Sequence, residues 1–348
     1  MEQVGGLPLI TLNGDARSRG LQHGAALSTK IHRMIEVYRG FFGMSDAEVF
    51  EIAAHFRSVI RSFNPDYGVE IEGIAEASDT DPLWIYALNA RSEFLSFVPA
   101  TECTVLHFKG TPYLGQNWDW EESLEPLITL VRIERNDGPS ILMMTEPGII
   151  GKIGLNEAGL GVCFNFLNID RPTNGLPTHI LLRAILEAGS LDDARETIMR
   201  AGPGRSSNML VADRQGDRFD IEFAATEQFE VPDKSAVMAH TNHYLDRDMF
   251  ALPHILENST LRYDRVRTLE AEAQSLDRET MERMLSDTAN PGNAICQSYR
   301  AREPLGEMGT VCTLTMDLAA GDMAIRRGNN PADGLEHIGL SGARVAAD

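Results

Sequence analysis

The sequence changes character abruptly at Cys103, and this change constrains the fold more than any other feature. Residues 1–102 place apolar side chains at helical spacing, and Ser45 followed by Glu48 forms a capping box, which marks a helix start. From Cys103 to about Val237, short alternating runs are separated by Gly, Asn and Asp, a pattern typical of strands. No Pro-, Gly- or Ser-rich linker separates the two parts. We therefore expect the boundary at Cys103, called the seam below, to lie within one domain.

The strand-rich part predicts a layered α+β fold. The stretches IERNDGPSIL and LVADRQGDRFDI contain hairpin turns, and a helical pattern covers residues 180–201. A second helical block follows, and the chain closes with two more strands. Antiparallel strands and helices in separate blocks are typical of sheets packed against helical layers. With 348 residues the chain is long enough for one large core, and we expect a single domain over residues 1–348.

The charge, the N-terminal residues and the cysteine spacing argue against several classes of partner and site. The formal net charge is -20, from 31 basic and 51 acidic residues, which argues against nucleic acid and anionic membranes as partners. The N-terminus does not resemble a signal peptide and no long apolar run is present, so we expect a cytoplasmic protein that does not span a membrane. The cysteines are widely spaced without a CxxC motif, which indicates neither a zinc site nor a disulfide framework. They are Cys103, Cys163, Cys296 and Cys312.

Cys103 has the surroundings of a nucleophile. A thiol reacts as its thiolate and needs a base or a lowered pKa. One candidate base is a histidine, since His240 and His243 stand together in AHTNHYLDRD. The other is the α-amino group of Cys103 itself, which cutting the preceding peptide bond would free. That amine has an unperturbed pKa of about 7.7–8.0, and the Thr104 side chain is placed to orient it.

Short motifs follow one another along the chain in an ordered series. They are RGLQHG, EIEGIAEAS, LNARSE, ECT, GQNWDW, GKIGLNEAGLGVCFNFL, SSNMLVADRQGD and HTNHY. Each is weak alone, but their order and spacing over nearly the whole chain are specific. Together they resemble the acyl-coenzyme A:isopenicillin N acyltransferase family of N-terminal nucleophile (Ntn) hydrolases. The resemblance implies an αββα sandwich, in which two antiparallel sheets lie between helical layers, together with self-cleavage before a cysteine and action on amide bonds.

The resemblance also assigns roles to residues of this chain. Cys103 resembles the nucleophile, and Asp119 resembles the acid, in a turn after the first strand, that positions the new amine. Asn242 resembles the oxyanion-hole amide. A donor of this kind stabilises the transition state by about 2.7–4 kcal/mol.

Further residues are expected to form the substrate pocket. Asn117 and Trp118 would shape its wall, and His240 would line it. The family also uses an arginine late in the chain, and we place Arg262 in the pocket as its first candidate. The full set of candidates for that arginine is Arg262, Arg300 and Arg302.

The predicted cleavage site lies between Glu102 and Cys103. A cut there makes residues 1–102 a helical small subunit and residues 103–348 a sheet-rich large one, which explains a seam without a linker. Glu102 departs from the family, because a small residue such as Gly stands at this position in the fungal acyltransferases. Its carboxylate either slows the N-to-S acyl shift or assists proton transfer during it.

The sequence therefore predicts a self-processing amidohydrolase or acyltransferase that forms a Cys103 thioester. The substrate is expected to be a small-molecule amide of the N-acyl, β-lactam side-chain or β-alanyl type. Hydrolysis is favoured over transfer, because no coenzyme A phosphate site is evident and water is the nearest acceptor. The expected partner is the cleaved helical segment, as an α/β heterodimer that is compatible with a higher homo-oligomer. No cofactor or metal is expected.

Other interpretations remain open. Cys103 also fits a buried structural thiol, and Asp119 and Asn242 also fit turn residues, although the motif context favours function for each. His240 and His243 fit a structural or pocket-lining pair rather than metal ligands, because no third ligand stands at suitable spacing. Two alternative functions are a non-catalytic ligand-binding member of the same fold and a single-chain Cys–His hydrolase. The other three cysteines are expected in the core.

Overall fold

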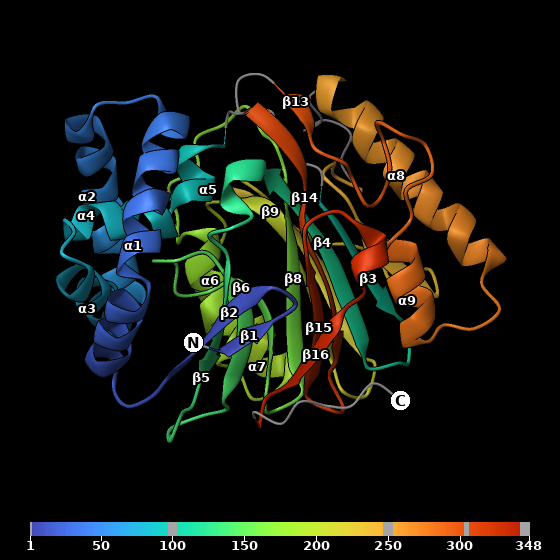
Figure 1. Ribbon diagram of the computed structural model, residues 1–348, viewed down its shortest axis with the longest axis horizontal. Helices are drawn as coiled ribbons and strands as arrows, with labels where there is room; N and C mark the ends of the chain where they lie inside the picture. Colours follow the sequence, from blue (N-terminus) through green and yellow to red (C-terminus); the bar gives the residue numbers. More distant parts are fainter. Residues whose placement is uncertain (1, 97–102, 246–252, 303–305, 342–348) are drawn as a thin grey trace.

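Two sheets packed face to face form the centre of the molecule (Figure 1). The computed structural model describes residues 2–96, 103–245, 253–302 and 306–341. Among these residues the first sheet has nine strands. Their order is β1 (Glu2–Val4), β2 (Leu7–Leu12), β5 (Thr129–Ile133), β6 (Ile141–Thr145), β7 (Ile153–Asn156), β8 (Leu160–Phe166), β9 (Ser206–Asp213), β10 (Arg218–Ala224) and β11 (Glu227–Glu230).

The second sheet has seven strands within the same described ranges and carries the residues around Cys103. Its order is β12 (Val237–His240), β3 (Thr104–Phe108), β4 (Tyr113–Glu121), β14 (Gly306–Asp317), β15 (Asp322–Arg327) and β16 (Glu336–Gly339), with β13 (Arg300–Arg302) beside β14. Its strands pair antiparallel throughout. Side chains from β3 and β4 meet those of β8 between the sheets.

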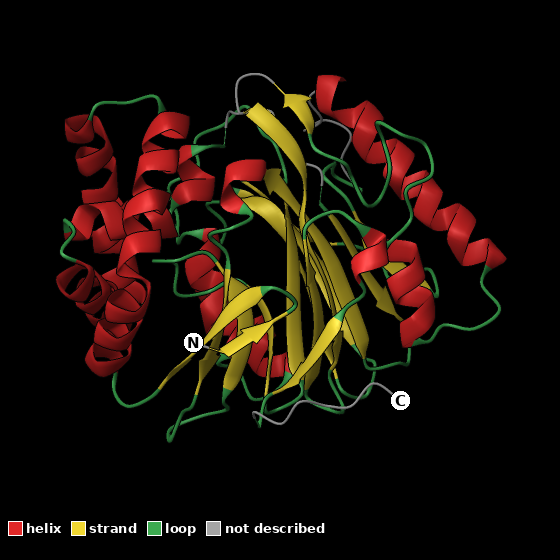
Figure 2. Ribbon diagram, in the orientation of Figure 1, coloured by secondary structure: helices red, strands yellow, loops and turns green. Residues whose placement is uncertain are grey.

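Helices cover the outer face of each sheet (Figure 2). The helices α6 (Thr178–Leu186) and α7 (Leu191–Ala201) pack on the nine-stranded sheet. The helices α8 (Pro253–Glu272) and α9 (Arg278–Leu285) pack on the seven-stranded sheet. The order helix, sheet, sheet, helix confirms the predicted α+β class and its αββα sandwich.

The helices that precede Cys103 gather in a block at one side of the sandwich (Figure 1). They are α1 (Ala16–Phe42), α2 (Asp46–Phe63), α3 (Pro65–Ser78), α4 (Pro82–Asn89) and α5 (Arg91–Phe94). The predicted capping box is present at the start of α2, where the Ser45 main-chain N–H donates to Glu48 Oε2 at 2.9 Å. No helix in the described ranges is long and apolar enough to cross a bilayer.

Two local expectations from the sequence are wrong. The first twelve residues are not helical, because β1 and β2 bury the apolar run Leu7–Leu12 and join the nine-stranded sheet. Strand β2 pairs in parallel with β5, so strands from both sides of the Cys103 seam form one sheet. Residues 115–120 do not form a turn either, because they lie inside β4, between β3 and β14. The turn before β4 covers residues 109–112.

Candidate active site

Cys103 lies directly before β3, between the two sheets. Thr104 pairs with Asn117 of β4, so Cys103 stands opposite Trp118 at the next position of the ladder. Successive side chains on a strand alternate between faces, which places Cys103 and Trp118 on the same face. Gln116 shares this face, because it lies two residues before Trp118 on β4. Its Nε2 donates to the Phe164 carbonyl of β8 at 2.6 Å, so the face points into the sandwich. The thiol is only 6% exposed, and its Sγ lies 3.7 Å from the Asp119 carbonyl oxygen.

Arg262 links the predicted nucleophile to the predicted oxyanion residue. This fully buried side chain of α8 donates from Nη1 to the Cys103 carbonyl at 2.6 Å and to Thr104 Oγ1 at 3.0 Å. Its Nη2 donates to Asn242 Oδ1 at 2.8 Å. Asn242 in turn donates from Nδ2 to the Phe166 carbonyl at 2.9 Å. One guanidinium therefore fixes Cys103, Thr104 and Asn242 relative to one another.

The structure distinguishes among the three arginine candidates by their contacts. Arg262 reaches Cys103, as described above. Arg300 lies on β13, and its Nη2 donates to the Gly292 carbonyl and to Gln297 Oε1. Arg302 lies at the exposed end of the same strand. The contact with the predicted nucleophile therefore favours Arg262.

Asp119 is a fully buried carboxylate on β4. It pairs across the ladder with Thr310 of β14, and strand alternation puts its side chain on the opposite face of β4 from Trp118. Burial raises the pKa of the Cys103 thiol to about 12, and the negative charge of Asp119 contributes to the increase. The nearby Arg262 charge opposes it. With an intact peptide bond before Cys103, the thiol is therefore neutral near pH 7.

The two expected wall residues of β4 have different surroundings. Asn117 donates from Nδ2 to the carbonyls of Leu285 and Ile295, at 2.7 Å and 2.9 Å, and so ties β4 to the end of α9. Trp118 faces the other way, into the sandwich, and is 2% exposed. The Lys152 Nζ lies 3.0 Å from the centroid of its ring. Asn117 thus contacts the helical layer, and Trp118 lies between the sheets beside Cys103.

A buried ionic cluster, which the sequence did not suggest, lies behind Trp118. Glu146 Oε2 accepts hydrogen bonds from Lys152 Nζ at 2.6 Å and from Arg91 Nη2 at 2.7 Å. Glu146 Oε1 accepts one from the Tyr38 hydroxyl at 2.5 Å. Arg91 and Tyr38 come from the helical block before Cys103, whereas Glu146 and Lys152 flank the β6–β7 connection. The cluster therefore connects residues before Cys103 to residues after it through an ion pair and a hydrogen bond.

His240 and His243 both lie beside Thr241, and His243 Nδ1 is 3.1 Å from Thr241 Oγ1 and 2.8 Å from Ser259 Oγ. His240 is fully buried, with Nε2 at 2.9 Å from Glu222 Oε1 and Nδ1 at 2.6 Å from the Thr241 carbonyl. Burial lowers the pKa of His240, but the negative charges of Asp220 and Glu222 outweigh it and raise that pKa above its ordinary value. Among the described residues, no group of three His, Cys, Asp or Glu side chains is arranged to hold a metal ion.

Asn165 is a further candidate that the sequence analysis missed. It lies on β8, next to the Phe164 main chain that Gln116 contacts, and alternation points it into the sandwich. Its side chain is fully buried, and neither amide atom has a hydrogen-bond partner among the described residues. Buried amides are normally paired, so this one is suited to receive a polar group of a ligand. A polar residue inside the apolar run GLGVCFNF was the signal that could have identified it.

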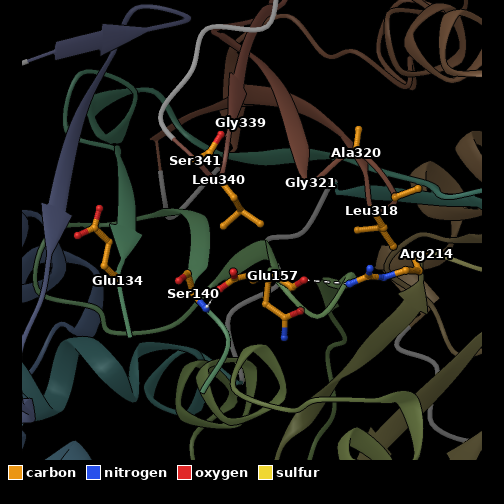
Figure 3. A pocket seen from close by; sticks show the side chains of 12 residues that line it. Glu134, Ser140, Glu157, Arg214, Leu318, Ala320, Gly321, Gly339, Leu340 and Ser341 are labelled. Carbon is orange, nitrogen blue, oxygen red and sulfur yellow. Dashed lines mark hydrogen bonds between the residues drawn. The ribbon is translucent and has the colours of Figure 1, made fainter. Parts of the chain in front are cut away.

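A sizeable hollow lies at the other end of the sandwich (Figure 3). It has a volume of about 510 Å³ and is bordered by the β7–β8, β9–β10 and β14–β15 turns. The Arg214 side chain beside it donates to the carbonyls of Glu157 and Ala158, at 2.9 Å and 3.0 Å. Cys103 stands near the opposite ends of β4 and β14, as the pairing of Asp119 with Thr310 shows. The hollow is therefore separate from the thiol.

Comparison with known proteins finds a family model and a curated relative that match the sequence. A family model described as "Acyl-coenzyme A:6-aminopenicillanic acid acyl-transferase" matches residues 107–332. The chain is 30% identical over 338 residues to the "Acyl-coenzyme A:6-aminopenicillanic-acid-acyltransferase 40 kDa form" of Emericella nidulans. That alignment covers 92% of this chain and 93% of the relative.

Solved structures that align with the chain include the following two. A Caenorhabditis elegans N-acylethanolamine-hydrolyzing acid amidase (NAAA) ortholog aligns with a TM-score of 0.45 and 16% identity, covering 62% of this chain and 93% of that chain. A mutant of the conjugated bile acid hydrolase from Clostridium perfringens aligns with a TM-score of 0.48 and 14% identity, covering 71% of this chain and 97% of that chain.

Proposed function

The chain belongs to the acyl-coenzyme A:6-aminopenicillanic acid acyl-transferase family, and on this premise we propose that it is a self-processing enzyme that cleaves a small-molecule amide through a Cys103 thioester. Family membership supports an enzyme of the acyltransferase or amide-hydrolase kind. The identity of the nucleophile and the self-cleavage are the parts of the proposal that rest on the site.

The contacts of Arg262 are the observation that carries the proposal. The guanidinium gathers the Cys103 carbonyl, the Thr104 hydroxyl and the Asn242 amide oxygen around one buried point. Holding reacting groups in fixed geometry removes much of the entropic barrier to their reaction. A structural thiol would not need this arrangement, whereas a nucleophile with an oxyanion donor would.

Cutting the chain before Cys103 would activate the thiol. In the uncut chain burial and the charge of Asp119 keep the pKa of Cys103 at about 12, far above neutrality. A freed α-amino group, with an unperturbed pKa of about 7.7–8.0, could accept the thiol proton. The same Asp119 carboxylate would then stabilise the ammonium that forms. Asp119 thus opposes an isolated thiolate but favours a thiolate–ammonium pair.

The first reaction is the cut itself. Cys103 Sγ attacks the carbonyl carbon of residue 102, the C–N bond to Cys103 breaks, and the Cys103 nitrogen takes the thiol proton. Water then hydrolyses the resulting thioester, which releases a carboxylate at residue 102 and restores the thiol. Glu102 lies outside the described residues, so its effect on this step stays a prediction.

The second reaction repeats this chemistry on a substrate amide. The thiolate attacks the substrate carbonyl, and the Asn242 side chain stabilises the oxyanion. Its Nδ2 carries two hydrogens, of which one is donated to the Phe166 carbonyl, so a second is left to donate. The buried Asn165 amide offers another donor from the facing sheet. The Cys103 ammonium protonates the leaving amine, and water or a second amine resolves the thioester.

The substrate class follows from chemistry that the family name shares with the sequence interpretation. The name of the Emericella nidulans relative describes transfer of an acyl group from an acyl-coenzyme A to the amine of 6-aminopenicillanic acid, which forms an amide bond and releases the coenzyme A thiol. We propose an N-acyl or β-lactam side-chain amide for this chain. Hydrolysis is the favoured outcome, and transfer to a second amine is the alternative that the family name supports. We retain the cytoplasm as the proposed location, supported by four free thiols.

The two fragments are proposed to stay together after the cut. Strand β2 pairs with β5 across the seam, and Arg91 and Glu146 form a buried ion pair across it. Arg183 and Glu70 form another, at 3.0 Å. Removing one partner of a buried ion pair typically destabilises a protein by about 3–5 kcal/mol, so such contacts resist separation.

Denaturing mass spectrometry of freshly purified protein tests the proposal. We expect two fragments that coelute before denaturation, the larger one beginning Cys-Thr-Val. Cys103→Ala should give one uncut chain without activity, whereas the control Cys163→Ala should still be cut. Full activity from a single uncut chain would refute self-processing, and an active Cys103→Ala variant would refute the nucleophile.

A further inference from the structure

Lys152 is a buried cation that the proposed reaction leaves without a role. Its side chain is fully buried at the end of the β6–β7 connection, between the sheets. It has two close partners, the Glu146 carboxylate at 2.6 Å from Nζ and the Trp118 ring, whose centroid lies 3.0 Å from Nζ. An ammonium on the face of an indole is a favourable but incomplete substitute for water.

The charges of this cluster do not balance within it. Glu146 carries one negative charge, and Arg91 already pairs with it through Nε at 2.9 Å and Nη2 at 2.7 Å. The Tyr38 hydroxyl adds a neutral donor. Protonated Lys152 therefore leaves one net positive charge buried between the sheets. Such a charge is costly unless a nearby anion compensates it.

Two thiols flank the Trp118 ring, over which Lys152 lies. Trp118 pairs with Cys312 of β14 on one side, and Cys103 stands opposite it on the other, one position before the Thr104–Asn117 pair. The row Cys103, Trp118, Cys312 shares one face of the sheet, and Lys152 lies over its middle member. The positive charge of Lys152 acts against the increase that burial causes in the pKa values of both thiols.

We propose that Lys152 is the buried counter-charge of the Cys103 thiolate, acting across Trp118 to favour ionisation of the nucleophile. Lys152 is thus a positioning residue, because it contacts Trp118 and Glu146 and acts on the sulfur through space. The inference rests on the proposed function, in which Cys103 is the nucleophile. By this inference, the Lys152–Glu146–Arg91 cluster favours ionisation of Cys103 in addition to stabilising the fold.

The charged groups around Lys152 and Cys103 determine how ionisation of the thiol affects protonation of Lys152. Burial lowers the pKa of Lys152 to about 7, Glu146 raises it and Arg91 lowers it, so the side chain gains or loses its proton near neutrality. His179 of α6 stays neutral there, because burial lowers its pKa. A thiolate at Cys103 adds a negative charge, which favours protonated Lys152. The groups that face the thiol from other elements are Asp119, Arg262, Lys152, Arg91 and Cys312.

The test compares Lys152→Met with Lys152→Arg. The Met variant leaves Glu146 paired with Arg91 and Tyr38, so it creates no unpaired buried charge. The rate of Cys103 alkylation by iodoacetamide is followed against pH in matured protein, with peptide mass spectrometry to resolve the four thiols. We expect the midpoint of Lys152→Met to rise by about one pH unit, while Lys152→Arg stays within a few tenths of wild type. At pH 7 this corresponds to an approximately tenfold lower kcat with little change in KM.

An unchanged midpoint in Lys152→Met would overturn the inference. So would a Lys152→Arg midpoint that moves as far as the Met midpoint, since side-chain shape would then be responsible. The readout is chemical modification rather than turnover, so it separates this inference from the proposed function. That function fails on a different result, an active Cys103→Ala variant.

A reciprocal experiment covers the case in which Lys152→Met blocks maturation. Cys103→Ala and Cys103→Asp are both unable to cut themselves, and the Asp carboxylate supplies the negative charge of a thiolate. Tryptophan fluorescence should report Lys152 deprotonation through Trp118, and the step should disappear in each variant when Lys152→Met is added. We expect its midpoint to lie about one pH unit higher in Cys103→Asp than in Cys103→Ala. Coinciding midpoints would contradict the proposed coupling.

Discussion

Replacing Asn242 by Ala and, in parallel, by Asp separates the two tasks that its amide can perform. The oxygen accepts a hydrogen bond from Arg262 at 2.8 Å, and the nitrogen donates to the Phe166 carbonyl at 2.9 Å. Asn242→Ala removes both functions. Asn242→Asp keeps an acceptor for Arg262 but removes the N–H donors and places a negative charge where the oxyanion forms.

The expected loss appears in kcat. The oxyanion exists only after attack, so its donor stabilises the transition state and hardly affects substrate binding. Loss of one such donor typically costs about 2.7–4 kcal/mol, which lowers kcat by roughly 100- to 1000-fold with little change in KM. We expect Asn242→Asp to be no better than Asn242→Ala, although it retains the contact with Arg262.

The assay must count only matured enzyme, because the acyl shift passes through a similar tetrahedral species and Asn242 variants will also cut themselves more slowly. Active sites are therefore titrated through the free N-terminal Cys103, and kcat is normalised to that number. Recovery of wild-type kcat in Asn242→Asp would show that Asn242 serves only to hold Arg262. A matured Asn242→Ala enzyme with normal kcat and raised KM would make it a binding residue.

Two further predictions concern groups around the site. Cys163→Ala and Cys312→Ala should each lower the unfolding free energy by about 1 kcal/mol or somewhat more and keep turnover, because both thiols are fully buried; an inactive but well-folded Cys312→Ala with an active Cys103→Ala would exchange their roles. Although burial opposes it, the charges of Arg91 and Lys152 lower the pKa of Glu146 from 4.5 to about 2. Its contribution to stability is therefore complete above pH 4.5 and lost as the pH falls through about 2. Chemical denaturation should show this loss in wild type and a smaller one in Glu146→Gln.

Features that depend on neighbouring residues could be predicted from the sequence. The Ser45–Glu48 capping box needs only four consecutive residues, and it is present as expected. The layered α+β class followed from the separate blocks of helical and alternating patterns. Leu7–Leu12 was missed because its parallel partner, β5, lies more than a hundred residues further along the chain. The turn expected around Asp119 is absent, because GQNWDW lies in a central strand that pairs with β3 and β14, and neither partner is adjacent to the motif in the sequence.

The way in which the predicted site residues come together depends on contacts between elements that are distant in the sequence. Cys103 and Asn242 come together through Arg262, but the choice of Arg262 over two other arginines depended on how α8 packs on β3. Lys152 lies in the motif GKIGLNEAGLGVCFNFL, but the sequence did not indicate its burial, because a lysine near a glycine usually indicates a solvated loop. Its burial arises from Glu146 on the other side of the connection and from Trp118 on the facing sheet.

The parallel pairing of β2 with β5 bears on whether the chain folds before or after the proposed cleavage. Residues Leu9–Leu12 pair with β5, which lies on the other side of the proposed cut, in the way that a donated strand completes a pilus subunit. Without that donated strand, β5 would present unpaired main-chain groups, which invite edge-to-edge aggregation. The proposed cut at Cys103 would therefore divide one sheet rather than separate two folding units. We expect folding to precede that cut, because residues 103–348 synthesised alone would lack the strand that covers the edge of β5.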